Sequence, residues 1–259
     1  MPYTAYFHTK MTLNNSKLSI ITATYNSSKH LPALIASLRA QTCQDFEWVV
    51  ADGNSSDGTV ELLKQVTDLK LSWVSEHDFG IYDAMNKAIQ RSQSEYYLVI
   101  GSDDVLSENA VEKILANLQT EPKLDLLVGN VYANGKLVHV ETGNSFIYGA
   151  RAYVTTHSVG SVFRKQLHQE YGYYSKNFPI IADSYFIKTI FANASLRVKY
   201  VDDVFGTFST GGASSTLVLQ CYCEGLHIQL LTEKFPLLQI LMFTARYMKL
   251  RLLPKKASP

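Results

Sequence analysis

Residues 18–26 read Leu-Ser-Ile-Ile-Thr-Ala-Thr-Tyr-Asn, an apolar and β-branched run that becomes polar at its end. Such a run is typical of a buried strand over 18–24, and comparable runs predict strands over 46–51, 71–75 and 96–100. Between the first two strands, Leu31, Leu34, Ile35 and Leu38 are spaced as on one helix face, and similar stripes recur up to residue 118. This alternation predicts an α/β fold in which helices cover a parallel sheet.

The chain beyond Pro122 has a less regular pattern, with β-like runs at 124–128, 137–140 and 197–201 and one helix near 184–191. It contains no linker rich in Pro, Gly or Ser and no internal repeat. We therefore predict one domain that follows a flexible N-terminus (1–16). The domain has a first half (17–120) and a second half on the same sheet (121–233), followed by a basic, amphipathic C-terminal tail (234–259).

The composition excludes several classes of protein. Of 259 residues, 46% are apolar, which is enough for a sizeable core, and 24 Lys and Arg balance 23 Asp and Glu, which argues against a nucleic-acid partner. Three cysteines without metal-ligand spacing favour a reduced, intracellular chain. The sequence has neither a signal peptide nor an apolar run of about 18 residues, so we expect a protein of the cytoplasm or of the inner face of a membrane.

The C-terminal tail from Lys234 carries six Lys or Arg residues and no acid among many apolar residues. A cationic helix with an apolar face suits contact with anionic lipid headgroups. A terminal helix that packs on the domain with a solvated basic face explains the pattern equally well.

Polar residues follow each of the four predicted strands, and the carboxyl ends of parallel strands meet at one edge of the sheet, where ligands bind. Each turn taken singly is also explained by helix caps and turn residues. Four such turns at one edge favour a binding site. They contain Thr22, Thr24, Tyr25 and Asn26, then Asp52, Gly53 and Ser55, then Glu76, His77 and Asp78, then Ser102, Asp103 and Asp104.

Asp103 and Asp104 follow the strand over 96–100 after only Gly101 and Ser102, so their like charges are held close together. A hard divalent cation, Mg²⁺ or Mn²⁺, relieves that repulsion and keeps open positions for substrate phosphates. No glycine-rich phosphate loop with a lysine is present, so we expect metal to neutralise the phosphates.

Four ordered segments resemble the motif set of family 2 glycosyltransferases: residues 22–26, 52–59, 76–87 and 101–104. The run Ile-Tyr-Asp-Ala-Met-Asn-Lys at 81–87 is similar to members that build bacterial exopolysaccharide, colanic acid and O-antigen. The resemblance implies the GT-A fold, a Rossmann-like and mostly parallel central sheet with helices on both faces. It also implies inverting transfer of a sugar from a nucleotide-diphosphate sugar, usually a UDP-sugar.

The resemblance also assigns roles to residues of the first half, which would hold the nucleotide sugar. Thr22, Thr24, Tyr25 and Asn26 would line the nucleoside pocket, Asp52 would contact the base, and Asp78 would lie near the base and ribose. Asp104 matches the metal ligand of the Asp-x-Asp motif and Asp103 its ribose- or sugar-facing neighbour. Ser102 stands where a strict motif has its first acid, which leaves Asp104 as the principal protein ligand.

The second half matches the family more loosely, and it would bind the acceptor. Residues 157–164, from His157 to Arg164, resemble a segment that ends in a basic residue. Gly211 and Gly212 resemble a loop at the mouth of the site, and Asp183 matches the general base, although Ala182 replaces the Glu that many relatives have before it. The Gln-x-x-Arg-Trp signature of processive synthases is missing, which favours addition of a single sugar to a glycan or lipid-linked acceptor.

Alternatives remain open for several residues. Asp183 has two compatible candidate roles, general base and N-cap of its helix, of which we favour the base; Asp202 and Asp203 are the next acidic candidates. His157 is either a pyrophosphate or acceptor contact or a histidine of the core or surface. Arg164 is either a phosphate contact or a surface charge. For the whole chain, the rivals are a nucleotidyltransferase and a non-catalytic protein that binds sugar nucleotides.

Overall fold

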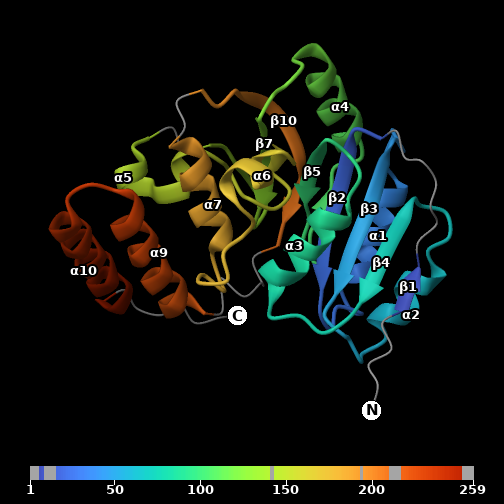
Figure 1. Ribbon diagram of the computed structural model, residues 1–259, viewed down its shortest axis with the longest axis horizontal. Coiled ribbons are helices and arrows are strands. Elements are labelled where there is room, and N and C mark those ends of the chain that lie inside the picture. The colour runs from blue at the N-terminus through green and yellow to red at the C-terminus, as the bar shows by residue number, and fades with distance from the viewer. Residues whose placement is uncertain (1–5, 9–15, 141–142, 193–194, 210–216, 253–259) are drawn as a thin grey trace.

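The computed structural model describes residues 6–8, 16–140, 143–192, 195–209 and 217–252 (Figure 1). Its strands are β1 (Tyr6–His8), β2 (Leu18–Thr24), β3 (Phe46–Asp52), β4 (Leu71–Ser75), β5 (Tyr96–Val99), β6 (Val105–Leu106), β7 (Leu126–Ala133), β8 (Lys136–Val138), β9 (Ser161–Arg164) and β10 (Val198–Phe208). Its helices are α1 (Leu31–Arg39), α2 (Thr59–Gln65), α3 (Ile81–Arg91), α4 (Ala110–Thr120), α5 (Ser145–Tyr148), η1 (Gly149–Ala152), α6 (Leu167–Tyr171), α7 (Ala182–Phe191), α9 (Val218–Thr232) and α10 (Pro236–Leu252).

The strands form one sheet in the order β1-β4-β3-β2-β5-β9-β7-β10-β6, with β8 paired to β7. β2, β3, β4, β5, β7 and β10 run in one direction, whereas β1, β6, β8 and β9 run in the other. The mostly parallel sheet is therefore confirmed, and the carboxyl ends of β2 to β5 share one edge, as expected.

Two apolar clusters pack on opposite faces of the sheet. One joins α1, α2 and α4 to residues such as Ile20 and Trp48, and the other joins α3, α6 and α7 to residues such as Ile21 and Tyr97. Because side chains alternate between the two faces of a strand, the run at 18–24 supplies both clusters. Helices on both faces are thus confirmed.

Several elements differ from the sequence-based expectation. β2 and β4 have the predicted bounds, whereas β3 extends to Asp52 and β5 ends at Val99. Within the first 16 residues, which we expected to be flexible, β1 pairs antiparallel with β4. The short strand β9 was not predicted; it inserts antiparallel between β5 and β7.

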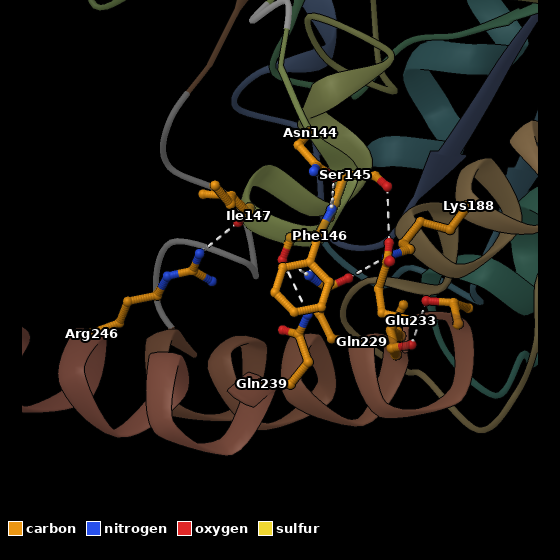
Figure 2. A network of polar contacts seen from close by, with 11 residues as sticks. Asn144, Ser145, Phe146, Ile147, Lys188, Gln229, Glu233, Gln239 and Arg246 are labelled. Carbon is orange, nitrogen blue, oxygen red and sulfur yellow. Dashed lines mark hydrogen bonds and ion pairs between the residues drawn. The ribbon is translucent and has the colours of Figure 1, made fainter. Parts of the chain in front are cut away.

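The C-terminal region forms two helices, α9 and α10, at the end of the molecule far from β1 (Figure 1). Side chains of both helices donate hydrogen bonds to backbone carbonyls of α5: Gln229 and Gln239 to Phe146, and Arg246 to Ile147 (Figure 2). Lys188 of α7 forms a buried ion pair with Glu233. None of the helices among the described residues is long and apolar enough to cross a membrane.

Gly129 of β7 provides a test of the packing between sheet and core. A Cβ at this position would lie 2.6 to 2.8 Å from ring atoms of the fully buried Phe205. We expect Gly129→Ala to lower the free energy of unfolding by about 1–3 kcal/mol, measured by urea denaturation, because the ring must move. The matched control is Gly225→Ala in α9, where the nearest atom is 3.9 Å away. It should leave stability equal or raise it by up to ~1 kcal/mol; equal effects of the two substitutions would contradict the packing.

Candidate active site

A cavity of about 750 Å³ lies at the carboxyl ends of β2 to β5, where the strand-end residues were expected to meet. It gathers Thr24, Tyr25, Asn26, Asp78 and Asp103 from the predicted set. Thr22, Asp52, Asp104, His157, Arg164 and Asp183 do not line it. Its other walls come from the strand ends and the turns that follow them, from α3 and from the segment before α7. These residues are Ala23, Ser27, His30, Gly53, Asn54, His77, Gly80, Ile81, Ala84, Met85, Ile100, Gly101, Ser102 and Pro179.

Asp52 lies beneath the cavity, with 1% of its surface exposed. Its carboxylate accepts hydrogen bonds from the hydroxyls of Thr24, Ser55 and Ser75 and from the backbone N–H of Ser55. These bonds join the ends of β2, β3 and β4. Thr22 is also buried and accepts a hydrogen bond from the indole N–H of Trp48. In this structure both residues organise the strand ends from below the cavity.

The carboxylate of Asp78 lies at the cavity wall, next to Gly53. A Cβ on Gly53 would lie 2.6 Å from Oδ2 of Asp78, so a larger residue would push the carboxylate away. The other oxygen of Asp78 accepts a hydrogen bond of 2.9 Å from the N–H of Gly80, at the start of α3. The pair therefore places a carboxylate at the wall of the cavity, beside the 69% exposed ring of Tyr25.

The neighbouring carboxylates of Asp103 and Asp104 have different environments. Asp103 is half-buried and borders the cavity. Asp104 is 2% exposed, and its oxygens accept hydrogen bonds from the N–H groups of Gly101 and Ser209 and from the hydroxyl of Ser158. Burial raises the pKa of Asp104, although these hydrogen bonds act in the opposite direction.

The described residues contain no group of three His, Cys, Asp or Glu side chains that could hold a metal. A magnesium ion bound together with substrate phosphates needs one or two protein carboxylates and keeps several waters. Asp103 offers such a carboxylate at the cavity wall. The arrangement fits a cation that arrives with a diphosphate.

Asp183 lies in the first turn of α7, but it is not the N-cap, which is Ile181. The alternative that it caps this helix is therefore wrong. Its Oδ1 instead accepts a hydrogen bond of 2.7 Å from the hydroxyl of Tyr82 on α3. Burial, and next the charge of Asp183, raise the pKa of Tyr82 well above its ordinary value, so the phenol remains a donor. The N–H groups of Ile180 and Ile181 both bond the carboxylate of Glu224 from α9.

His157 belongs to a buried polar chain. Its Nε2 lies 2.6 Å from the hydroxyl of Tyr174, which lies 2.9 Å from that of Tyr97, which in turn lies 2.7 Å from Nε2 of His168. Burial lowers the pKa of His157 and of His168, the latter to about 4. This geometry favours the core interpretation of His157.

The low pKa of His168 predicts a dependence of stability on pH. The folded state binds this proton more weakly than the unfolded state, whose histidine has a pKa of about 6.5. Acidification from pH ~6.5 towards ~4 should therefore lower the free energy of unfolding. His168→Phe should reduce this slope in urea denaturation, whereas the exposed His77→Gln should not. An unchanged slope in His168→Phe would contradict the assignment.

Arg164 lies at the opposite edge of the sheet. Since β9 runs antiparallel to β5, its last residue pairs with Tyr96 at the start of β5. There the guanidinium forms ion pairs with Glu95 and Asp125, which matches the surface-charge alternative. Gly211 and Gly212 lie outside the described residues.

Two polar residues near Asp183 were missed by sequence reasoning. Tyr82 lies within the motif segment 76–87, but nothing in the local pattern indicates that its hydroxyl meets α7. Glu224 comes from α9, 41 residues after Asp183 in the chain, and gives no local signal.

Comparisons with known proteins identify relatives of this chain. The family model described as "Glycosyl transferase family 2" matches residues 19–199. A PGL/p-HBAD biosynthesis glycosyltransferase of Mycobacterium bovis is 29% identical over 206 residues, which cover 77% of this chain and 80% of the relative. Poly(ribitol-phosphate) beta-N-acetylglucosaminyltransferase TarS of Staphylococcus aureus is 29% identical over 125 residues, covering 46% of this chain and 22% of TarS.

Solved structures share the fold. TarS in complex with UDP-GlcNAc aligns with a TM-score of 0.67 and 20% identity, over 90% of this chain and 73% of that one. The mannosyltransferase PcManGT from Pyrobaculum calidifontis, in complex with GDP-Man and Mn²⁺, aligns with a TM-score of 0.63 and 16% identity, over 92% and 76% of the two chains. The predicted GT-A fold is confirmed.

Proposed function

Because this chain belongs to glycosyl transferase family 2 and is a glycosyltransferase, we propose that it moves a single sugar, with inversion, from a UDP-sugar to an acceptor hydroxyl. The acceptor is a lipid-linked or growing glycan of a bacterial surface polysaccharide. The observation that carries the proposal is the cavity at the ends of β2 to β5, bordered by the carboxylates of Asp78 and Asp103. The family match and the relatives favour glycosyl transfer over the nucleotidyltransferase alternative.

The nucleoside occupies the part of the cavity near Tyr25 and Asp78. A carboxylate accepts the N–H of a uracil ring, and an exposed aromatic ring provides a surface for a base. Asp52, which we expected to contact the base, is engaged by four donors from its own chain. We therefore assign Asp52 the role of holding the strand ends and Asp78 that of the base contact. Neighbours that carry UDP-GlcNAc and GDP-Man support a nucleotide-sugar donor.

Asp103 is the carboxylate that would hold Mg²⁺ or Mn²⁺ together with the donor diphosphate. The cation would neutralise charge on the leaving nucleotide. Asp104, our first choice for the ligand, has both oxygens engaged by Gly101, Ser158 and Ser209. It fixes the turn that presents Asp103.

Asp183 acts as the general base. It takes the proton of the acceptor hydroxyl while that oxygen forms a bond to the anomeric carbon. The bond from the anomeric carbon to the diphosphate breaks, and the nucleotide leaves with the electron pair. Tyr82 donates to one oxygen of Asp183 and thereby orients the other.

The nucleotide assignment is tested by thermal stabilisation. A ligand that binds the native state raises the melting temperature. UDP with Mg²⁺ or Mn²⁺ should raise it more than GDP does, and more than UDP in excess chelator. Equal stabilisation by UDP in chelator would refute the metal contribution, and a larger effect of GDP would refute the uracil assignment.

The chain also contacts an anionic membrane at the inner face of the bilayer through α10. Phe235, Leu237 and Leu241 are 66% to 76% exposed, and Leu237, Leu241 and Met248 lie on one side of the helix. Arg246 and Gln239 anchor another side to α5 (Figure 2). Lys234 and Lys249 are exposed, and residues 234–259 contain no acid, so their charge complements anionic headgroups.

Sedimentation with vesicles tests this contact. The chain should bind vesicles of phosphatidylcholine with phosphatidylglycerol more tightly than pure phosphatidylcholine, and salt should weaken binding. The double variant Leu237→Glu, Leu241→Glu should lose binding. Leu137→Glu, at an exposed leucine of β8, serves as the control. Equal sedimentation of both variants would rule out this surface.

A further inference from the structure

A second cavity, of about 510 Å³, lies between β7 and β10, away from the donor cavity. Its polar lining includes Asn130 of β7, Tyr200 and Asp202 of β10, and His139, which follows β8. Val128 and Val140 add apolar walls. None of these residues has a role in the chemistry described above.

An irregularity of the sheet forms this cavity. β10 pairs with β7 in parallel up to Tyr200 and again from Val204, but the register shifts between these two residues. Residues 201–203 therefore lie outside the ladder. Such bulges re-aim side chains and are common next to active sites.

Asn130 of β7 forms hydrogen bonds with Asp202 and His139 at the wall of this cavity. It is 6% exposed, and its Nδ2 donates to the backbone carbonyl of Asp202. Its Oδ1 must then face Nδ1 of His139, 3.1 Å away, and oxygen accepts. In the neutral form of His139, Nδ1 is therefore the donor and Nε2 the acceptor.

Two further polar groups of the lining face solvent. Tyr200 is 50% exposed. Among the described residues, the Asp202 carboxylate has no hydrogen bond or ion pair. The cavity thus offers an aromatic ring, a carboxylate and an imidazole acceptor beside aliphatic walls.

This chemistry selects a neutral, polyhydroxylated ring. Sugar hydroxyls donate to carboxylate and imidazole acceptors, and the C–H face of a sugar packs on an aromatic ring. A phosphate would be repelled by Asp202, because the lining contains no Lys or Arg. A metal is disfavoured, since no cluster of three ligands occurs in the described part of the chain.

The position of the cavity suits the acceptor. β7 is the second strand from β5 and β10 the third, which corresponds to roughly 10 and 15 Å at the usual strand spacing. Ser209, directly after β10, donates its N–H to Asp104. This bond links the end of β10, one of the two strands at the second cavity, to the turn that carries Asp103.

We propose that the cavity between β7 and β10 is a carbohydrate-binding subsite for the acceptor, in which Tyr200, Asp202 and His139 hold a sugar distant from the reacting hydroxyl. The subsite rests on the proposed glycosyl transfer for its purpose, but its binding of sugar can be measured without turnover.

Saturation-transfer NMR on the full chain tests the proposal. The probes are the methyl glycosides of glucose, galactose, mannose and N-acetylglucosamine, with saturating UDP and Mg²⁺ present to fill the donor cavity. At least one glycoside should receive saturation. Tyr200→Ala and Asp202→Asn should each weaken its binding by about tenfold. Tyr132→Ala serves as the matched control, because Tyr132 is 42% exposed on β7 outside the cavity.

Three outcomes would overturn the subsite: no saturation of any probe, loss of the signal when UDP is added, or equal binding by Tyr200→Ala, Asp202→Asn and Tyr132→Ala. Asp202→Asn changes one exposed side chain, and melting temperatures verify that each variant is folded. The stabilisation of the same samples by UDP reports on the donor site independently. Failure of the subsite with intact UDP stabilisation therefore leaves the proposed function standing.

Discussion

Replacing Asp183 with asparagine should lower turnover by about 10²- to 10⁴-fold and leave donor affinity nearly unchanged. A general base acts on the acceptor hydroxyl, so its loss affects the chemical step and not the binding of the nucleotide. Asparagine has nearly the same shape, and its Oδ1 can still accept the hydrogen bond from Tyr82. The fold should therefore be retained.

The measurement combines steady-state kinetics, UDP affinity and melting temperature for wild type and Asp183→Asn. Loss of turnover with unchanged UDP affinity and unchanged melting temperature supports the base. Asp203→Asn is the control, because this carboxylate pairs with Lys113 of α4, a helix that packs on the face of the sheet opposite to α7. Full transferase activity in Asp183→Asn would refute the assignment and make Asp202 the next acidic candidate.

Asp103→Asn should weaken the metal-dependent part of UDP affinity by at least the 10- to 100-fold that is typical when a neighbour of a metal ligand is removed. The reason is that Asp103 is the carboxylate at the cavity wall, and Mg²⁺ sites of this kind have few protein ligands. Calorimetric titration with UDP, in Mg²⁺ and in chelator, measures the effect.

Asp104→Asn is the matched variant at the adjacent carboxylate, and it should behave differently. Its amide nitrogen would face a hydrogen-bond donor, either Ser209 or the pair Gly101 and Ser158. A mismatched buried donor costs about 1–3 kcal/mol of stability. Loss of metal dependence in Asp104→Asn at unchanged stability, with normal binding by Asp103→Asn, would reverse our assignment of the two carboxylates.

The first half of the fold could be predicted from sequence because its signals are local. The run at 18–24 is long, β-branched and bounded by polar residues, and each following helix has a regular apolar stripe. Strand β9 has only four residues and runs against its neighbours, so its direction is decided by tertiary packing. The position of Arg164 at the far edge follows from that direction.

The site was predicted as a set of strand ends, but the orientation of each side chain was not. Asp103 and Asp104 are adjacent, and which of them faces the cavity depends on Ser158 and Ser209, which are distant in the chain. Asp52 also depends on a partner that is distant in the chain. Its buried carboxylate accepts a hydrogen bond from the hydroxyl of Ser75 in β4. Tyr82 and Glu224 form hydrogen bonds in and just before α7, and no periodic pattern in the sequence indicates these contacts.

The central claim is that this chain breaks the bond between sugar and diphosphate of a UDP-sugar and transfers the sugar. Phosphorus NMR of the full chain with Mg²⁺ or Mn²⁺ and a panel of UDP-sugars, with and without saccharide acceptors, measures which bond is cleaved. We predict that UDP accumulates with at least one donor and that Asp183→Asn suppresses it. With pyrophosphate also supplied, accumulation of UTP and sugar 1-phosphate would identify a nucleotidyltransferase, and a bound donor that remains intact under all conditions would identify a binding protein; either result would contradict the account.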